Sequence, residues 1–562
     1  MILTADFETT TDPLDCRVWV WGLCEIGNTE NFLHGKTIDS LMEYCDTYDN
    51  HTLYFHNLRF DGTFLMVWLF EHGFSHVTDR RELTDKTFTT LISDKGQFYT
   101  MTIVFSKKGK KTKKVTIFDS LKILPFSVKD IAKGFNLPIK KGEIDYNKPR
   151  PIGYDADPEE LDYLKGDVSI MAMSLQTLFA QKLTQMTQGS NALHDYKNTV
   201  TVSNFERWFP VPLYDADVRQ SYKGGFTYLD PRYTNKDIGE GIVLDVNSLY
   251  PSVMRNRLLP YGDGIFFTGE YTPDTFYPLY IQMFTCNFEL KKDHIPTIQL
   301  KNNMSFVPTQ YITSSAGEDV TLCLTSVDYE LFLSHYDVYN IDFISGWKFK
   351  ATIGLFTSYI DKWSKVKIDA KKEGNKALYT LAKLMLNALY GKFALNPNVQ
   401  SKIPIYDDGV IRYKLGEKET RDPLYVPVGT FVTSWARFTT ITAAQKVYDR
   451  FVYADTDSLH LKGKDLPELE ISDTELGLWK HECTFEKARF LRQKSYVEWY
   501  KDKDEDGNTF YLHITCAGLP DSCYPYVTWD NFRPGIKYAG KLQQTSVKGG
   551  IVLKNIDFTI KR

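Results

Sequence analysis

Four carboxylates and a tyrosine near the start of the 562-residue chain are spaced so that they could share one site. Asp6 and Glu8 are two positions apart in a strand-like segment, which places both on one face. Asp61 lies where a strand pattern gives way to a helix, and Tyr163 and Asp167 are one helical turn apart. Converging carboxylates repel one another unless hard cations lie between them. Two such ions would activate a water for phosphodiester hydrolysis.

A second set of acids lies in two later segments. Asp245 ends a buried-type strand pattern, and the turn that follows could present backbone N–H groups to a triphosphate. Asp455 and Asp457 are again two positions apart and could share a strand face or flank a tight turn. Two divalent ions here would lower the pKa of an attacking hydroxyl and neutralise charge on a transferring phosphoryl group.

A possible nucleotide-binding stripe lies between these two segments. Its residues are three or four positions apart, so they share one face of a helix: Lys376, Tyr379, Lys383, Asn387 and Tyr390. In isolation a solvated helix face would be the simpler interpretation. Beside the second set of acids, a role in gripping a triphosphate and stacking on a base is favoured.

The elements that must position these residues can be predicted from local patterns. Residues 1–185 alternate strands and helices, which indicates an α/β region. A helix over 158–182 should begin after Asp157, a good N-cap that precedes a proline. The later pattern predicts a strand–turn–helix at 241–256 and mostly β structure at 257–355. Two helices, broken near Gly374, are expected at 356–390. Short strands among turns should follow at 394–426, and a hairpin at 450–462.

The composition is that of a folded globular protein, with 43% hydrophobic and 25% charged residues and a net charge of −4. It excludes a disordered, collagen-like or disulfide-stapled chain. No apolar run approaches the roughly 18 residues of a membrane span, and the N-terminus has no secretory signal pattern. The eight cysteines include no CxxC pair, which indicates reduced thiols in a cytoplasm.

The small net charge hides an uneven distribution. Residues 362–392 carry eight lysines against two acids, and residues 531–562 carry seven basic residues against one aspartate. Basic blocks on an acidic body suit a protein that grips a phosphate backbone locally. Solvated helix faces would explain the same charges about as well.

The first set of acids resembles the active site of DEDD-type 3′–5′ exonucleases with the tyrosine variant of the third motif. The resemblance implies that the four carboxylates hold metals and that Tyr163 orients the attacking water. It also implies that a frayed primer end is held by Thr9, Asn57 and Phe60. Lys141 would be an electrostatic helper, and Glu143 a weaker candidate for the metal site.

The later segments resemble motifs A, B and C of family B DNA polymerases, at 245–251, 383–391 and 453–458. Further segments match a YxGG linker, a TxxAR motif and a KxY motif: 222–226, 433–437 and 494–496. With the exonuclease motifs in front and Cys516-Ala517-Gly518 behind, the whole chain resembles the phi29-type protein-primed phage DNA polymerases. Three positions depart from that pattern, namely Tyr379, Ala388 and Thr515.

This resemblance implies roles for individual residues. Asp245 and Asp457 would be the principal metal ligands, with the Val246 carbonyl and Asp455 assisting, and Tyr250 would exclude a 2′-hydroxyl. Nucleotide contacts would come from Tyr250, Lys367, Lys383, Asn387 and Tyr390. DNA contacts would come from Tyr222, Gly224, Gly225, Phe226, Ser248, Thr433, Arg437, Lys494 and Tyr496. Each active site would use two Mg²⁺ ions, with Mn²⁺ as a substitute.

The resemblance also implies a multidomain α/β and α+β architecture. A ribonuclease H-like exonuclease domain would be followed by a palm, fingers and thumb, with two terminal-protein-region insertions that encircle DNA. The expected boundaries are 1–185 for the exonuclease, 186–256 and 426–516 for the palm, 257–355 and 391–425 for the insertions, 356–390 for the fingers and 517–562 for the thumb.

The function so implied is protein-primed, processive and strand-displacing replication of a phage genome in the cytoplasm of an infected bacterium, with proofreading. The partners would be template-primer DNA, deoxynucleoside triphosphates and a terminal protein, with a monomeric polymerase and no membrane. Three alternatives compete with this interpretation: a DNA- or RNA-primed repair polymerase, a nuclease with an inert polymerase half, and a non-catalytic single-strand binding protein. Two full sets of acids argue against the single-strand binding protein, because unpaired carboxylates repel phosphate.

Overall fold

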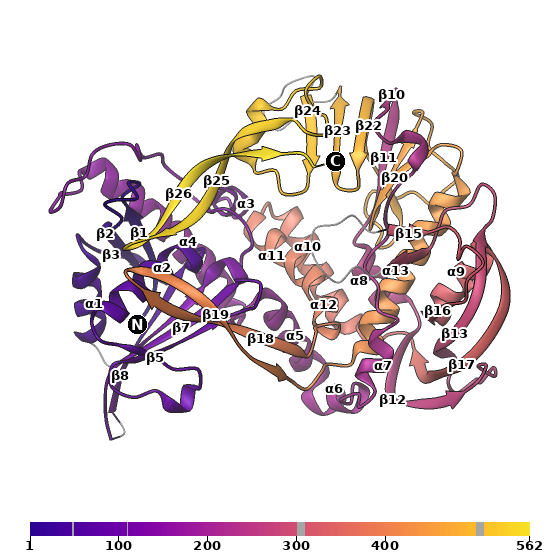
Figure 1. Ribbon diagram of the computed structural model, residues 1–562, viewed down its shortest axis with the longest axis horizontal. Helices are drawn as coiled ribbons and strands as arrows, with labels where there is room; N and C mark the ends of the chain where they lie inside the picture. The colour runs from indigo at the N-terminus through magenta and orange to yellow at the C-terminus, as the bar shows by residue number, and fades with distance from the viewer. Residues whose placement is uncertain (48–49, 110, 301–309, 502–510, 562) are drawn as a thin grey trace.

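A computed structural model describes residues 1–47, 50–109, 111–300, 310–501 and 511–561 (Figure 1). Two large sheets organise the molecule, one in the N-terminal region and one in the later part of the chain. A pair of helices, α10 and α11, lies between them, and two long hairpins cross from the second region to the first (Figure 1). All eight cysteines are free thiols. In the described ranges, no helix is both long and apolar enough to cross a membrane.

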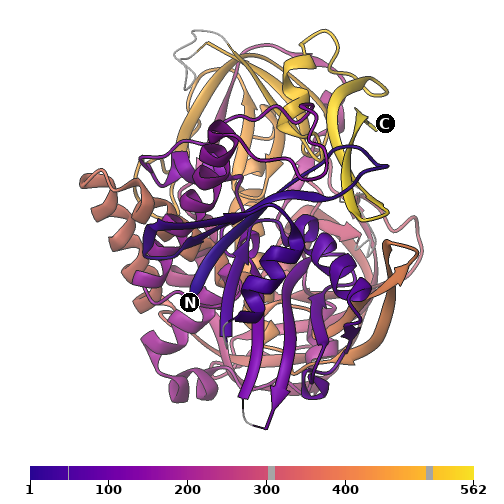
Figure 2. The ribbon, with the colours of Figure 1, turned by 90° about the vertical axis from the view of Figure 1, so that its left-hand side faces the viewer.

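The N-terminal sheet has eight strands in the order β3-β2-β1-β4-β8-β7-β6-β5. The region that contains it faces the viewer in Figure 2. Strands β1, β4 and β8 are parallel, so their carboxyl ends meet at one edge. The strands are β1 (Ile2–Thr9), β2 (Val18–Glu25), β3 (Asn28–Gly35), β4 (Asn50–Phe55), β5 (Ser75–His76), β6 (Thr87–Ile92), β7 (Phe98–Lys108) and β8 (Lys111–Asp119). Helices α1 (Ile38–Thr47), α2 (Leu58–Glu71) and α4 (Pro158–Ala180) pack on the sheet, and α3 (Val128–Gly134) packs on α4.

The start of α4 agrees with the prediction from its sequence. The Asp157 side chain accepts a hydrogen bond from the backbone N–H of Glu160, and the Glu160 carboxylate accepts one from the N–H of Asp157. This capping box satisfies two donors that a helix N-terminus would otherwise leave unpaired. The helix therefore has a defined first residue and a defined direction across the sheet.

The second sheet has the order β24-β23-β22-β11-β21-β20-β9, with β10 paired to β22. Helices α8 (Leu249–Asn256) and α13 (Val426–Lys446) pack together beside it. The predicted hairpin at 450–462 is formed by two neighbouring strands of this sheet. The strands are β9 (Thr227–Leu229), β10 (Asp237–Ile238), β11 (Gly241–Val246), β20 (Phe451–Asp455), β21 (Ser458–Lys462), β22 (Trp479–Arg492), β23 (Ser495–Tyr500) and β24 (Tyr511–Cys516).

Two further units are inserted between the strands of this sheet. The first is a four-stranded sheet with α9 (Ser326–His335) against it: β12 (Leu259–Thr268), β13 (Leu279–Leu290), β16 (Val320–Thr325) and β17 (Tyr336–Thr352), accompanied by the small pair β14 (Ile298–Leu300) and β15 (Gln310–Ile312). The second consists of α10 (Thr357–Lys372) and α11 (Lys376–Ala388), separated at Gly374, whose φ of +69° cannot continue a helix. Shorter helices α5 (Gln188–Val200), α6 (Val202–Trp208), α7 (Asp215–Arg219) and α12 (Tyr390–Phe393) complete the core around them.

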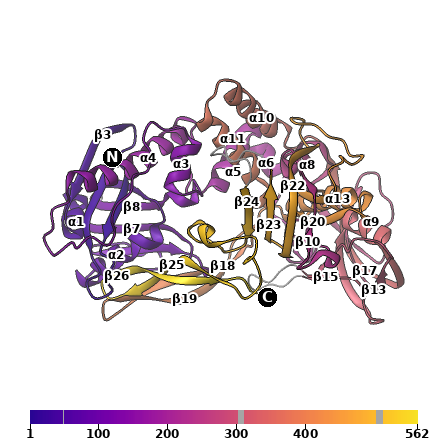
Figure 3. The same ribbon diagram turned by 90° about the horizontal axis from the view of Figure 1, so that it is seen from above.

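Two hairpins return to the N-terminal region, where they lie side by side (Figure 3). They are β18–β19 (Asn398–Asp407 and Val410–Thr420) and β25–β26 (Lys537–Val547 and Gly550–Thr559). Ile411 of the first and Ile551 of the second are buried in the core of the N-terminal sheet. The prediction of short strands at 394–426 is therefore wrong: the strands have 10 and 11 residues. Their polar sequence hides this length because their apolar contacts come from a distant part of the chain.

Candidate active sites

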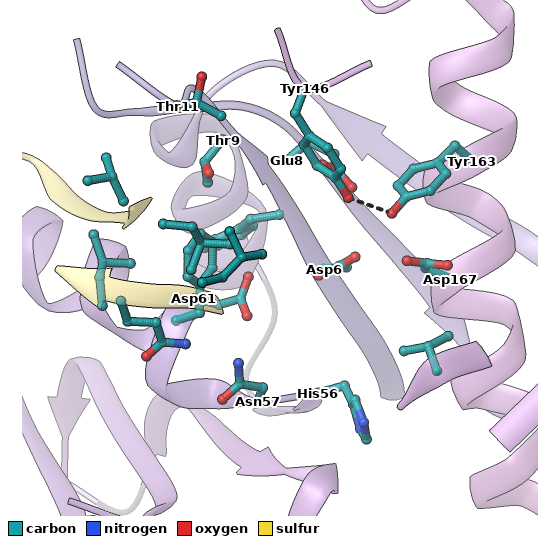
Figure 4. Close-up of a pocket in the computed structure, with 18 of the residues that line it drawn as sticks. Asp6, Glu8, Thr9, Thr11, His56, Asn57, Asp61, Tyr146, Tyr163 and Asp167 are labelled. Carbon is teal, nitrogen blue, oxygen red and sulfur yellow. Dashed lines mark hydrogen bonds between the residues drawn. The ribbon is translucent and has the colours of Figure 1, made fainter. Parts of the chain in front are cut away.

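Nine of the predicted exonuclease residues line one cavity of about 590 Å³ at the carboxyl end of β1 (Figure 4). They come from β1, from the first turn of α2, from the middle of α4 and from the loop that precedes α4. The residues are Asp6, Glu8, Thr9, Asn57, Phe60, Asp61, Lys141, Tyr163 and Asp167. The pattern of carboxylates along the sequence therefore corresponds to a single place in the fold.

Local backbone geometry explains why these acids meet. Asn57 ends the strand-to-helix connection with a φ of 74°, and its N–H donates to Asp119 Oδ1 at 3.0 Å. This turn starts α2 at the sheet edge, so Asp61 in its first turn enters the cavity. On the other side, Thr4 Oγ1 donates to the carbonyl of Val168 at 2.7 Å, which holds α4 against β1 beside Asp167.

The cavity carries more negative charge than its surroundings compensate. Burial and the nearby Asp167 raise the pKa of Asp6 to about 7. Burial followed by neighbouring carboxylates holds the pKa of Glu8 and of Asp61 well above the usual range. One oxygen of Asp61 and one of Asp167 are buried without a hydrogen-bond partner among the described residues. Unpaired carboxylate oxygens of this kind fit hard divalent cations.

The carboxylates do not complete a metal site alone. In the described part of the chain, no three acidic, histidine or cysteine side chains converge tightly enough to hold an ion. Mg²⁺ is usually bound by one or two carboxylates together with waters and substrate phosphates. Glu143 is exposed and does not line the cavity, so its predicted place beside the metals is not supported.

Two side chains from the loop before α4 contact the face of that helix that carries Tyr163 and Asp167. Lys141 Nζ forms an ion pair with Asp167 and lies 5.1 Å from the centre of the Tyr163 ring. Tyr146 Oη is hydrogen-bonded to Tyr163 Oη at 2.9 Å (Figure 4). Tyr146 was not predicted from the sequence, because a single tyrosine in an irregular loop carries no spacing signal. His56, also unpredicted, is held in the wall by Ser120 Oγ and the carbonyl of Phe126 at 3.0 and 2.8 Å.

The opposite wall of the cavity comes from the end of the chain. The β25–β26 hairpin contributes apolar and amide side chains there: Leu542, Gln544, Ile551, Val552, Leu553 and Asn555. No local pattern links these residues to Asp6, which lies more than 500 positions away. Only the folded chain brings them together.

The second set of acids meets on the second sheet. Strand β11 pairs with β21 in a register that places Asp245 opposite Ser458, and the N–H of Val246 donates to the carbonyl of Asp457 at 2.8 Å. Burial followed by the charge of Asp457 raises the pKa of Asp245 to about 7. Burial also raises the pKa of Asp457, while the cation of Lys383 acts in the opposite direction on both.

Asp455 differs from these two acids because its charge is compensated. Lys494 Nζ contacts both carboxylate oxygens of Asp455 at 2.8 Å. Thr227 Oγ1 and Tyr453 Oη donate to the same group at 3.0 and 3.2 Å. In the described part of the chain Asp245 and Asp457 form no ion pair, and Asp455 holds the KxY lysine beside them.

The residues predicted to bind nucleotide surround this pair. The Tyr250 and Tyr390 rings are stacked, with centres 4.0 Å apart and an angle of 19° between their planes. Lys383 and Asn387 are exposed on α11, one turn apart. Lys367 on α10 has a lowered pKa because of its burial and the neighbouring Lys383, so the two cations are close. A group carrying several negative charges would relieve their repulsion.

Some predicted DNA ligands are inside the molecule. Arg437 is 2% exposed; it pairs with Asp328 and donates to the carbonyls of Lys223 and Gly224 at 2.8 and 2.7 Å. Thr433 is also buried and bonds within its own helix. Arg437 can act on DNA only through the 223–224 backbone, whereas Gly224 and Lys494 are on the surface.

Comparison with known proteins identifies the class. A family model described as DNA polymerase type B, organellar and viral, matches residues 43–151 and 143–476. The chain therefore belongs to this family of DNA polymerases. The chain is 47% identical over 577 residues to the DNA polymerase of Bacillus phage M2, covering 100% of this chain and 99% of the relative. It is 46% identical over 574 residues to that of Bacillus phage phi29, with 99% and 98% coverage.

Comparison of the fold with solved structures identifies the same class of protein. An orthorhombic crystal form of Phi29 DNA polymerase matches with a TM-score of 0.95 and 45% identity over the whole of both chains. A Phi29 complex with primer-template DNA and incoming nucleotide substrates matches with a TM-score of 0.93 at 45% identity, again over both whole chains. These matches confirm the multidomain α/β and α+β fold and the resemblance to phi29-type phage DNA polymerases.

Proposed function

We propose that this DNA polymerase starts replication of a phage genome on a terminal protein, extends it processively with strand displacement and proofreads with a 3′–5′ exonuclease. One observation carries the proposal: the chain holds two separate groups of partly or fully buried carboxylates whose pKa values are raised. Each group has a lysine and a tyrosine beside it, namely Lys141 and Tyr163 in one site and Lys383 and Tyr390 in the other. Two such groups suit two phosphoryl reactions.

In the polymerase site, Asp245 and Asp457 would hold two Mg²⁺ ions, with Mn²⁺ as a substitute. The ions would supply Lewis-acid activation of the attacking hydroxyl and stabilise the leaving oxygen. Lys383 and Lys367 would bind the triphosphate, and Tyr250 would present its ring to the sugar. Tyr390, stacked on Tyr250, and Asn387 would contact the new base pair.

In the exonuclease site, Asp6, Glu8, Asp61 and Asp167 would hold the metals. Tyr163, fixed by Tyr146, would orient the attacking water, and Lys141 would keep Asp167 charged while it faces the other acids. The primer end would rest on Phe60 and on the polar groups of Thr9 and Asn57, under the apolar wall of the β25–β26 hairpin.

We keep the predicted domain boundaries as part of this proposal. The unit at 257–355 would be the first terminal-protein-region insertion and the β18–β19 hairpin the second, with the thumb at 517–562. The contact between the two hairpins supports an enclosed path for DNA. A DNA- or RNA-primed repair polymerase would have less use for this enclosure, and a nuclease with an inert polymerase half would not need Asp245, Asp457 and Lys383 together.

The test is extension of a labelled primer on a circular single-stranded template with Mg²⁺ and four deoxynucleotides. We expect products many times the length of the circle. In Asp457→Asn, extension should be lost while primer shortening continues. Products that stop at one circle length would refute strand displacement, and extension by Asp457→Asn would refute the metal role.

A second experiment tests protein priming. The polymerase is incubated with the cognate terminal protein, labelled deoxynucleotide and an origin fragment, and the protein is checked for covalent label. Label that requires Asp457 supports the use of one site for both primers. Absence of label, with DNA-primed extension intact, would favour the repair polymerase.

A further inference from the structure

A buried ion pair lies immediately behind the exonuclease cavity. Glu160, in the first turn of α4, is 4% exposed, and its Oε1 accepts hydrogen bonds from Nε and Nη2 of Arg150 at 3.1 and 3.0 Å. Its Oε2 accepts from the Tyr154 hydroxyl at 2.8 Å and from the Asp157 N–H at 3.0 Å. Both carboxylate oxygens are thus saturated, and this acid is unavailable as a metal ligand.

Besides Lys148, which pairs with Asp157 and Glu160 at 2.6 and 3.2 Å, Arg150 ties the irregular loop before α4 to the rest of the domain. It is 7% exposed, and it donates to the carbonyls of Lys148 and Asp145 at 3.2 and 2.8 Å. Its guanidinium lies 4.3 Å from the centre of the Trp19 ring on β2. The Arg150 side chain therefore contacts α4 and the sheet, and it also bonds two backbone carbonyls within the loop.

The same loop carries two side chains that contact the cavity residues of α4. Tyr146, which follows the Asp145 carbonyl, bonds to Tyr163, and Lys141 pairs with Asp167. Tyr146 is 51% exposed, so little packing of its own holds it in place. Glu160, Tyr163 and Asp167 are spaced three and four apart, so the anchor and both contacted groups share one helix face.

We infer that the Arg150–Glu160 pair is a positioning device for the exonuclease reaction, holding the loop so that Tyr146 and Lys141 meet Tyr163 and Asp167. This inference rests on the proposed exonuclease function. Two donors of the rigid guanidinium converge on one carboxylate oxygen, Oε1 of Glu160, so the orientation of the group is set as well as its distance. Neither residue lines the cavity, so both act through groups that do. Burial raises the pKa of Glu8, the charge of Arg150 acts in the opposite direction, and Glu160→Gln leaves that charge in place.

The test compares Arg150→Ala and Glu160→Gln with the wild-type enzyme. On a single-stranded primer, we expect kcat of shortening to fall by about tenfold to a hundredfold, because displacements near 1 Å have effects of that size. KM should change by less than about threefold, since Phe60, Thr9 and Asn57 are untouched. Extension of the same preparations at the second site reports that the chain is folded. Glu160→Gln keeps the side-chain length and an acceptor for the cap, and therefore covers the case in which Arg150→Ala is insoluble.

The matched control is another ion pair that involves the same loop region. Lys36 pairs with Asp155 at 2.5 Å, but the two side chains are 54% and 78% exposed. Lys36→Ala should shorten primers at the wild-type rate. A loss equal to that of Arg150→Ala would show that any disturbance of this region is enough, and would overturn the inference.

A double-mutant cycle separates positioning from general destabilisation. In a Tyr146→Phe, Lys141→Ala background, adding Arg150→Ala should cost less than about threefold, because the groups that it positions are already gone. Full multiplicative loss in that background, or wild-type shortening by Arg150→Ala, would refute the inference. A wild-type enzyme that shortens no primer would instead refute the proposed exonuclease itself.

Discussion

The N–H of Gly549 donates a hydrogen bond to the carbonyl of Gly409 at 2.9 Å, joining the tips of two hairpins that lie far apart in the sequence. Both residues have positive φ, +90° and +84°, as tight turns require. Beside them, Lys548 Nζ lies 3.2 Å from Asp408 Oδ1. The β18–β19 and β25–β26 hairpins thus form a closed contact over the N-terminal region, and the proposed processivity depends on it.

Opening this contact should shorten the products. In Gly549→Ala the new Cβ would lie 2.4 Å from the carbonyl oxygen of Cys16, so the hairpin tip must move. We expect product length per binding event to fall severalfold, while the rate of adding one nucleotide stays the same. Single-cycle extension with a DNA trap measures both. Gly27→Ala is the control, because Gly27 also has a positive φ, +99°, but nothing lies within 4 Å of its Cβ position. Equal loss in the control would mean that backbone strain is responsible.

Removing the β1 carboxylates should separate the two activities. We expect Asp6→Ala with Glu8→Ala to reduce primer shortening by at least about a thousandfold, because the proposed metal ions would lose two anionic ligands. Extension should remain, since Asp245 and Asp457 belong to the other sheet. Gel analysis of a labelled primer with and without deoxynucleotides shows both results. Residual shortening at the wild-type rate would remove these acids from the mechanism.

Tyr250 should control the choice of sugar. Its ring is stacked on that of Tyr390, with centres 4.0 Å apart, and this contact limits its movement. We expect Tyr250→Val to admit ribonucleotides at least about tenfold more readily, because a close steric contact is lost. The ratio of kcat/KM for ribo- and deoxynucleotides measures this effect. Tyr339→Val on β17, at a side chain that is 55% exposed, serves as a control for loss of an aromatic ring. An unchanged ratio in Tyr250→Val would exclude Tyr250 as the gate.

Buried histidines should make the enzyme sensitive to mild acid. Burial lowers the pKa of His335 to about 4, and its Nδ1 is 2.7 Å from the carbonyl of Ile295. Because the unfolded chain binds a proton at higher pH, stability is complete above about pH 6.5 and falls as the pH approaches 4. At pH 4.5 the free energy of unfolding should have fallen by about 2.5 kcal/mol on account of this residue. Thermal unfolding between pH 7 and 4.5 should show a shallower decline in His335→Gln. An identical decline would assign the acid sensitivity to other groups.

Local sequence was sufficient where the chemistry depends on neighbours along the chain. Period-two spacing placed Asp6 with Glu8, and helical spacing placed Tyr163 with Asp167. Asp157 and Pro158 predicted the start of α4, and Gly374 predicted the break between two helices, because capping and positive φ are properties of a few adjacent residues. The family resemblance rested on these short segments, and the full-length relatives confirm it.

Tertiary structure decided everything that depends on which distant segments share a surface. Only the sheet register brings Asp245 to Asp457 while leaving Asp455 neutralised by Lys494. Only folding buries Arg437, which a motif had presented as a DNA ligand. The long strands of β18–β19 and the wall that β25–β26 adds to the exonuclease cavity also depend on contacts between distant segments. A polar strand is stable only when another region supplies its apolar contacts, and no periodicity within a strand records which region that is.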